Sequence, residues 1–172
     1  GYRTGQGAIP WYNGTRFARD QDIVVVSINY RLGALGFADL THLGEEFKTS
    51  NVNGMLDQIA ALQWVQRNIS AFGGNPDNVT IAGESAGAFS VGALMGCPAA
   101  KGLFSRAIAQ RGAAQHTLNP DAAQTGGKAF CAQLQQDNAV GLLAATVEDI
   151  LAAQNATAAQ FESGAGVISS LG

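Results

Sequence analysis

The sequence predicts an α/β fold with a mostly parallel sheet flanked by helices. Two short β-branched segments, at residues 22–29 and 79–82, and a short apolar segment at 106–110 are separated by stretches that favour helices. Strands that alternate with helices pair in parallel through right-handed crossovers. With 172 residues, the chain has the length of one domain.

Residues 22–29 form the clearest predicted strand. They read Asp-Ile-Val-Val-Val-Ser-Ile-Asn, a nearly continuous apolar and β-branched run. Such runs are typical of strands that are covered on both faces. We therefore expect this strand in the centre of the sheet, followed by a glycine-bearing loop from Arg31 to about Asn53.

An amphipathic helix is predicted next. Apolar residues recur at spacings of three and four, as they do along one face of an α-helix. Two consecutive glycines, Gly73 and Gly74, end this pattern. The apolar positions are Met55, Ile59, Leu62, Val65 and Ile69.

A strand, a sharp turn and a closely packed helix are predicted in direct succession after that helix. Residues 79–82 are mainly β-branched and follow the turn sequence Asn-Pro-Asp-Asn. Residues 83–87 read Gly-Glu-Ser-Ala-Gly, the G-x-S-x-G pattern of a turn that presents a serine hydroxyl at the end of a strand. The residues that follow, 88–96, are mostly small or apolar, which allows a helix to pack tightly against a sheet.

The G-x-S-x-G pattern makes Ser85 the candidate nucleophile. Side chains at Gly83 and Gly87 are expected to collide with neighbouring backbone, because the turn is tight and a helix begins directly after the serine. The pattern alone has modest specificity in a chain with 22 glycines. In the alternative interpretation, Ser85 is an ordinary helix N-cap. The strand before it and the helix after it favour the nucleophile.

The last part of the chain is predicted to be helical. Alanine- and glutamine-rich stretches indicate helices at about 121–136 and about 147–159. Thr146 and Asp149 have the spacing of a capping box at the start of the second helix. No periodicity is present in residues 163–172.

Composition argues against several function classes. Charged residues make up 13% of the chain, about half the usual share for a soluble domain. The net charge is −3 and the lysines and arginines are scattered, which argues against a nucleic-acid partner. No stretch reaches about 18 continuous apolar residues, so no membrane span is expected. Cys97 and Cys131 lack metal-like spacing and are predicted to be free buried thiols.

Five blocks of the sequence resemble the type-B carboxylesterase/lipase family, which includes bacterial carboxylesterases and the cholinesterases. The resemblance runs from Gly1 to at least Gln154. It implies a partial α/β-hydrolase fold and a serine carboxylesterase that acts on small-molecule esters through an acyl-enzyme, with no cofactor and no metal. The blocks lie at residues 29–37, 53–58, 61–65, 68–74 and 79–87.

The resemblance assigns roles to residues around the serine. Ser85 corresponds to the nucleophile, the backbone N–H of Ala86 to one oxyanion donor, and Gly1 to the last glycine of the oxyanion loop. Glu84 resembles a buried glutamate near the family's catalytic histidine, and a solvated turn carboxylate is the alternative. Arg111 stands where the family usually has the serine of a Gln-Ser-Gly sequence.

The order of residues leaves the catalytic triad incomplete. In α/β-hydrolases an acid and then a histidine follow the serine along the chain. His116 is the only histidine after Ser85, and no Asp or Glu lies between them. His116 is therefore predicted to be a surface loop residue. We expect the acid and the histidine beyond residue 172 in a longer chain, and little or no turnover from residues 1–172.

Family members are longer, so residues 1–172 are expected to belong to one catalytic domain. Residues 1–112 would form its sheet-and-helix core and residues 113–172 a helical segment. A non-catalytic adhesion relative on the same fold is the alternative function, which the retained Ser85 disfavours. A phosphate-binding turn is less favoured, since the elbow has neither G-x-x-x-x-G-K-[ST] nor G-x-G-x-x-G. Compartment and oligomeric state are left open.

Overall fold

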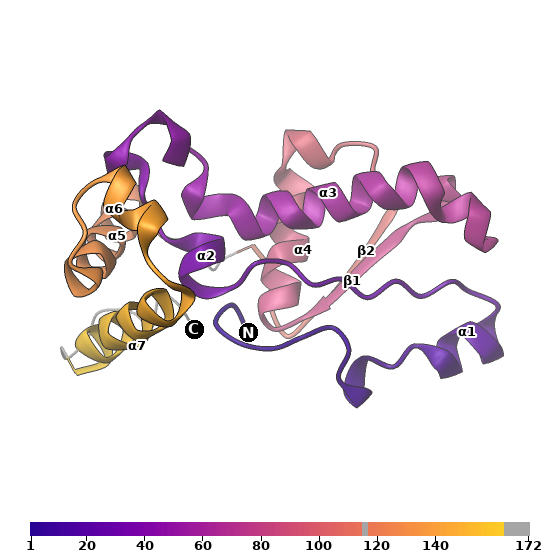
Figure 1. Ribbon diagram of the computed structural model, residues 1–172. Coiled ribbons are helices and arrows are strands. Elements are labelled where there is room, and N and C mark those ends of the chain that lie inside the picture. Colours follow the sequence, from indigo (N-terminus) through magenta and orange to yellow (C-terminus); the bar gives the residue numbers. More distant parts are fainter. Residues whose placement is uncertain (115–116, 164–172) are drawn as a thin grey trace. The chain divides into compact units, whose positions relative to one another are not determined.

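The computed structural model describes residues 1–114 and 117–163 (Figure 1). The predictions for His116 and for the final segment lie outside the described residues. The chain divides into two compact units, which we describe separately. Among the described residues, the first unit holds Gly1, 5–30 and 55–114, and the second holds 2–4, 31–54 and 117–163.

The first unit contains a two-stranded parallel sheet. Its strands are β1 (Thr80–Glu84) and β2 (Arg106–Gln110), paired in register from Thr80 with Arg106 to Glu84 with Gln110. Helix α4 (Ala86–Gly96) follows β1 directly. The predicted succession of strand, helix and parallel strand is therefore confirmed. β1 begins one residue later than expected and continues to Glu84.

Helix α4 packs closely in the first unit because many of its residues are glycine, alanine or serine. A Cβ on Gly92 would lie 2.7 Å from the backbone nitrogen of Ala114, so only glycine allows this approach. Apolar side chains of α4, β1, helix α3 (Asn53–Asn68) and the 3₁₀ turn Pro98–Ala100 form the core of the unit. The buried members of this core are Ile59, Ile81, Val91, Leu94 and Ala100.

Helix α3 confirms the predicted amphipathic helix. It ends at Asn68 and is followed by a 3₁₀ turn, Ile69–Phe72. Gly73 then adopts the left-handed conformation with φ of 80°, which ends the helical segment as the glycine pair predicts. Val65 and Ile69, two of the predicted apolar positions, are buried.

The predicted central strand at residues 22–29 is wrong for the described structure. Residues 23–32 belong to no strand and follow helix α1 (Thr15–Gln21) as an extended segment (Figure 1). A strand requires a neighbour that supplies N–H and C=O partners. The described residues form one sheet, in which β1 pairs with β2, so this segment has the composition of a strand without a partner strand.

The second unit is helical. Residues 31–53 contain helix α2 (Gly33–Phe37) and three 3₁₀ turns, so the predicted loop is wrong in this part. A five-residue helix is hard to predict from sequence. The free-energy cost of helix nucleation exceeds what its few hydrogen bonds contribute, so such a helix depends on contacts from elsewhere in the chain. Here a distant side chain supports it, since Ala34 N–H donates to Oε1 of Gln154 at 2.8 Å.

The predicted helices of the last part are present as α5 (Pro120–Leu134) and α7 (Val147–Ser163). The N-cap half of the predicted capping box is confirmed, because the Asp149 N–H donates to the Thr146 hydroxyl at 3.1 Å. The Thr146 hydroxyl in turn donates to Oδ2 of Asp149 at 2.7 Å. A further short helix, α6 (Ala139–Ala144), was not predicted.

Helices α5, α6 and α7 share a core with the α2 region. The buried cluster contains Phe130, Cys131 and Leu134 of α5, together with Leu142 of α6 and Ala153 of α7. Across the described residues, every helix is too short or too polar to cross a bilayer. The remaining buried members of this core are Ala34, Ala38 and Leu40.

Candidate active site

Ser85 occupies a sharp bend between β1 and α4. β1 ends at Glu84 and α4 begins at Ala86, so the bend is a single residue. Its φ of 55° and ψ of −118° lie in a region that residues with a Cβ rarely adopt. The predicted arrangement of strand, tight turn and helix is therefore confirmed. It leaves the serine at the carboxyl end of β1.

Two backbone hydrogen bonds hold this bend. The Ser85 N–H donates to the carbonyl oxygen of Gln110 at 3.0 Å, which continues the pairing of β1 with β2 beyond the strand end. The Ser85 carbonyl oxygen accepts from the Phe89 N–H at 3.0 Å, which begins the bonding pattern of α4. The strained serine is thus fixed from the sheet on one side and from the helix on the other.

The two glycines of the pattern have different surroundings. A Cβ on Gly83 would lie 2.2 Å from the backbone of Gly87, so the predicted collision is confirmed there. A Cβ on Gly87 would meet no atom within 4 Å, so the collision predicted at this position is wrong within the described residues. The close approach of strand and helix depends on Gly83.

Ala86 is buried at the first position of α4. Its N–H belongs to the first four amides of the helix, which lack acceptors within the helix, and the helix dipole favours negative charge at this end. This environment suits an oxyanion donor. Gly1 lies in the same unit and is exposed. The oxyanion role of both residues stays a prediction.

Glu84 is about half exposed and faces a positive charge. Its Oε1 lies 3.7 Å from Nη1 of Arg111, which is itself largely exposed. The proposed influence of Glu84 on a catalytic histidine stays a prediction. Arg111 has a φ of 59°, and the next residue, Gly112, has a φ of 153° and lies under the ring of Phe89.

Sequence reasoning missed the part that residues 110–112 play at the bend. Gln110 provides the carbonyl that binds Ser85, and a Cβ on Gly112 would lie 2.3 Å from the Phe89 ring. The sequence carried a weak signal for this, since a glycine directly follows the short strand and an arginine. Among residues 1–114 and 117–163, no group of three His, Cys, Asp or Glu side chains could hold a metal ion.

A parallel sheet with a serine bend that leads into a closely packed helix places the chain among proteins of the α/β-hydrolase fold. The comparisons with known proteins make this assignment specific. The chain belongs to the Carboxylesterase family, whose sequence profile matches residues 1–168.

Relatives and solved structures agree with this assignment. The chain is 50% identical over 121 residues to the para-nitrobenzyl esterase of Bacillus subtilis, covering 70% of this chain and 24% of the relative. It is 45% identical over 141 residues to a phenmedipham hydrolase of Pseudarthrobacter oxydans, covering 80% and 27%. A Geobacillus stearothermophilus carboxylesterase structure superposes with a TM-score of 0.87 and 42% identity, covering 96% and 34%. The chain thus spans about a quarter of the length of these curated relatives.

Proposed function

We propose that residues 1–172 form part of one catalytic domain of a serine carboxylesterase, with Ser85 as the nucleophile. In this proposal residues 1–112 belong to the sheet-and-helix core and residues 113–172 to a helical segment. The single-residue bend at the carboxyl end of β1 is the observation that supports it most. The name of one relative, para-nitrobenzyl esterase, and the family description are consistent with a carboxylic ester as substrate.

The proposed reaction proceeds through an acyl-enzyme. The Oγ of Ser85 attacks the ester carbonyl carbon while a histidine accepts its proton, and the carbonyl oxygen becomes an oxyanion. The N–H groups of Ala86 and Gly1 donate hydrogen bonds to that oxyanion. The histidine then protonates the departing alcohol. Water, activated by the same histidine, releases the acid and restores the serine.

The proton-transfer partners of Ser85 are proposed to come from polypeptide outside residues 1–172. An ordered acid and histidine are required after the serine, and no Asp or Glu lies between Ser85 and His116. Glu84 would stabilise the protonated histidine through its negative charge, and the charge of Arg111 at 3.7 Å from Glu84 would reduce that effect.

The first test measures hydrolysis of p-nitrophenyl acetate by residues 1–172. We expect no turnover that depends on Ser85, because the general base is absent. Turnover that Ser85→Ala abolishes would show that the partners lie within these residues and would overturn that part of the proposal.

The second test uses a longer polypeptide that includes residues 1–172 and carries esterase activity. We expect a fluorophosphonate probe to label Ser85, located by peptide mass spectrometry, and Ser85→Ala to abolish both labelling and hydrolysis. Ser90→Ala is the matched control, since Ser90 is a buried serine of α4, the helix that begins directly after Ser85, and is bonded to Gln58. Hydrolysis without labelling at Ser85, or hydrolysis that survives Ser85→Ala, would show that another residue is the nucleophile and would overturn the proposal.

A further inference from the structure

The sheet end that holds Ser85 carries a second residue in an unusual backbone conformation. Among the described non-glycine residues, a positive φ occurs at Asp22, Ser85, Arg111 and Gln135. Asp22 and Gln135 end helices α1 and α5, where a left-handed residue is common. Ser85 and Arg111 instead follow β1 and β2 directly, so both lie at the carboxyl end of the parallel sheet.

Arg111 is the lateral neighbour of Ser85. β1 and β2 pair in parallel up to Glu84 and Gln110. The Ser85 N–H donates to the carbonyl oxygen of Gln110 at 3.0 Å, which extends this register by one residue and sets Ser85 beside Arg111. Neighbouring strands lie about 4.8 Å apart, so the backbones of these two residues are neighbours at that spacing.

Packing within the described structure does not account for an arginine at this position. Arg111 has a φ of 59°, and its side chain is 85% exposed. Glycine adopts a positive φ without strain, whereas a residue with a Cβ does not. Strained residues concentrate at functional sites. The arginine side chain is therefore the feature that needs a function.

The guanidinium of Arg111 has hydrogen-bonding capacity beyond its ion pair. Nη1 of Arg111 lies 3.7 Å from Oε1 of Glu84. This is longer than a charge-assisted hydrogen bond of about 2.7–2.9 Å. Glu84 is 48% exposed, and exposed ion pairs contribute little because water screens them. The guanidinium presents several N–H donors in a planar fork that matches a carboxylate, so a ligand carboxylate can join or replace Glu84.

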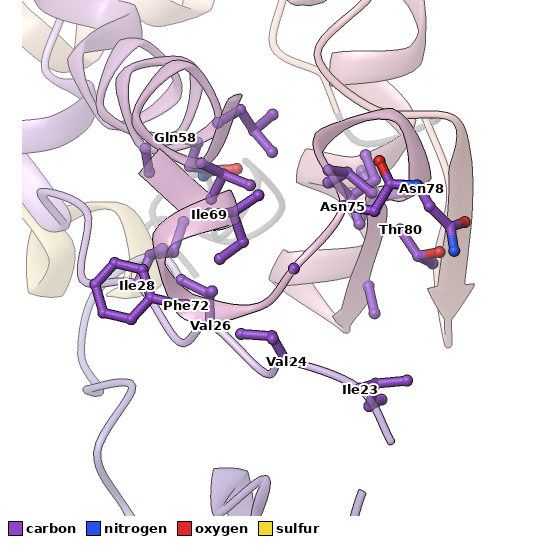
Figure 2. A pocket seen from close by; sticks show the side chains of 18 of the residues that line it. Ile23, Val24, Val26, Ile28, Gln58, Ile69, Phe72, Asn75, Asn78 and Thr80 are labelled. Atoms are coloured by element: carbon purple, nitrogen blue, oxygen red, sulfur yellow. The ribbon is translucent and has the colours of Figure 1, made fainter. Parts of the chain in front are cut away.

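The charge of Glu84 makes a nearby cation necessary if the substrate is an anion. Without Arg111, the sheet end beside Ser85 would present the negative charge of Glu84, which repels another carboxylate. The cavity beside β1 offers no substitute cation. Figure 2 shows apolar side chains, amides and a hydroxyl in it, and none of the described residues that line it is lysine or arginine.

We propose that Arg111 is a specificity residue that binds a carboxylate on the acyl group of the substrate. It raises the specificity for half-esters of short dicarboxylic acids, in which one carboxyl group is free, relative to neutral esters of the same length. The inference rests on the function proposed for Ser85. In the acyl-enzyme the acyl chain is bonded to Oγ of Ser85, so a carboxylate a few carbons away reaches the neighbouring Arg111.

The test uses the longer polypeptide with esterase activity and two matched substrates. One is the mono-p-nitrophenyl ester of glutaric acid, and the other is the same compound with its free carboxyl group methylated, which removes the charge. We expect Arg111→Gln to lower the ratio of kcat/KM for the anionic ester to that for the neutral ester about tenfold. Arg111→Lys keeps the charge but lacks the fork, so its ratio should fall by less.

Arg106→Gln is the matched control. Arg106 is an exposed residue at the opposite end of β2, where its side chain donates to Oδ1 of Asn78. Both Arg→Gln variants remove one positive charge from the same strand, so an effect of net charge alone would appear in both. We expect the parent ratio in Arg106→Gln. Added salt should lower the ratio in the parent more than in Arg111→Gln.

An unchanged ratio in Arg111→Gln, or an equal fall in Arg106→Gln, would overturn the proposal. Fluorophosphonate labelling of Ser85 checks that each variant keeps its site.

The proposed function can fail separately, through hydrolysis that survives Ser85→Ala. In that case an NMR titration of the 172-residue chain decides on Arg111 alone. We expect the Nε–H signal of Arg111 to shift and saturate with monomethyl glutarate and not with dimethyl glutarate. No shift, or the same shift with both compounds, would show that Arg111 binds no carboxylate.

Discussion

At the scale of single residues, the conformation of the bend at Ser85 depends on backbone contacts with neighbouring residues more than on the serine side chain. Its unusual backbone conformation is held by the Gln110 carbonyl and by the first turn of α4. The G-x-S-x-G pattern predicts the bend because a glycine at position 83 lets helix and strand approach. Nothing in the pattern identifies Gln110, since β2 is brought to the bend by parallel pairing over a long separation in sequence.

Gly83→Ala is predicted to destabilise the first unit, whereas Gly87→Ala is not. A Cβ on Gly83 would lie 2.2 Å from the Gly87 backbone, which cannot move without shifting α4. We expect the free energy of unfolding to fall by about 2 kcal/mol. Gly87→Ala has open space and a better helix former, so stability should be unchanged or rise by up to about 1 kcal/mol. Urea denaturation of both variants measures this, and equal losses would contradict it.

Cys131 is predicted to lower the free energy of unfolding as the pH rises in the alkaline range. Burial raises the pKa of its thiol above the ordinary value of 9.0. Above pH 9 the unfolded chain loses this proton while the folded chain keeps it, so stability falls as the pH rises. Below pH 9 both states are protonated and this contribution is constant.

The measurement for Cys131 compares urea denaturation at pH 8 and pH 10 in the parent chain and in Cys131→Ala. The decrease in the free energy of unfolding between pH 8 and pH 10 should be smaller in the variant. The variant should also be less stable at both pH values, because the substitution leaves a cavity. An identical decline in both proteins would exclude Cys131 as its source. Native alkylation by iodoacetamide should also be slow at Cys131, since the buried thiol is protonated.

At the scale of secondary-structure elements, prediction succeeded where the signals are local. The Thr146 cap on the Asp149 N–H and the glycine stop at Gly73 each depend on a few neighbouring residues, and both are present. The prediction of a strand at 22–29 was wrong because an apolar, β-branched composition indicates burial, whereas a β-strand also requires a neighbouring strand with which to pair. Helix α2 was missed because Gln154, far along the chain, supplies its support.

Gln154→Ala is predicted to destabilise the second unit through α2. The Gln154 side chain is buried, and its Oε1 accepts the N–H of Ala34 at the start of that helix. Removing the acceptor leaves a buried donor unsatisfied, which costs about 1–3 kcal/mol. Thermal unfolding measures the loss. Gln160→Ala, an exposed position on the same helix, is the control and should change stability by less than about 0.5 kcal/mol.

At the scale of the whole molecule, most of the buried apolar residues that the structure describes fall into two clusters, one in each unit. One contains Ile59, Ile81 and Leu94, all from the first unit, and the other contains Phe130 and further residues of the second unit. The units interleave in sequence, so no single cut of the chain separates them. Sequence analysis could not foresee this division, because periodicity reports which residues are buried and not which core they join.

Because the two cores are separate, we predict that a cavity created in one unit increases local unfolding of that unit and leaves the other unit protected. Phe130→Ala and Leu94→Ala each remove a buried side chain, at a cost of about 3–5 kcal/mol for phenylalanine and 2–5 kcal/mol for leucine. In native-state hydrogen exchange, Phe130→Ala should raise exchange in α5 and α7 while β1 and β2 stay protected. Leu94→Ala should show the reverse. Because the two variants are reciprocal, each serves as the control for the other. If either one accelerates exchange equally in both units, the cores unfold together, and the chain behaves as one cooperative body despite its two buried clusters.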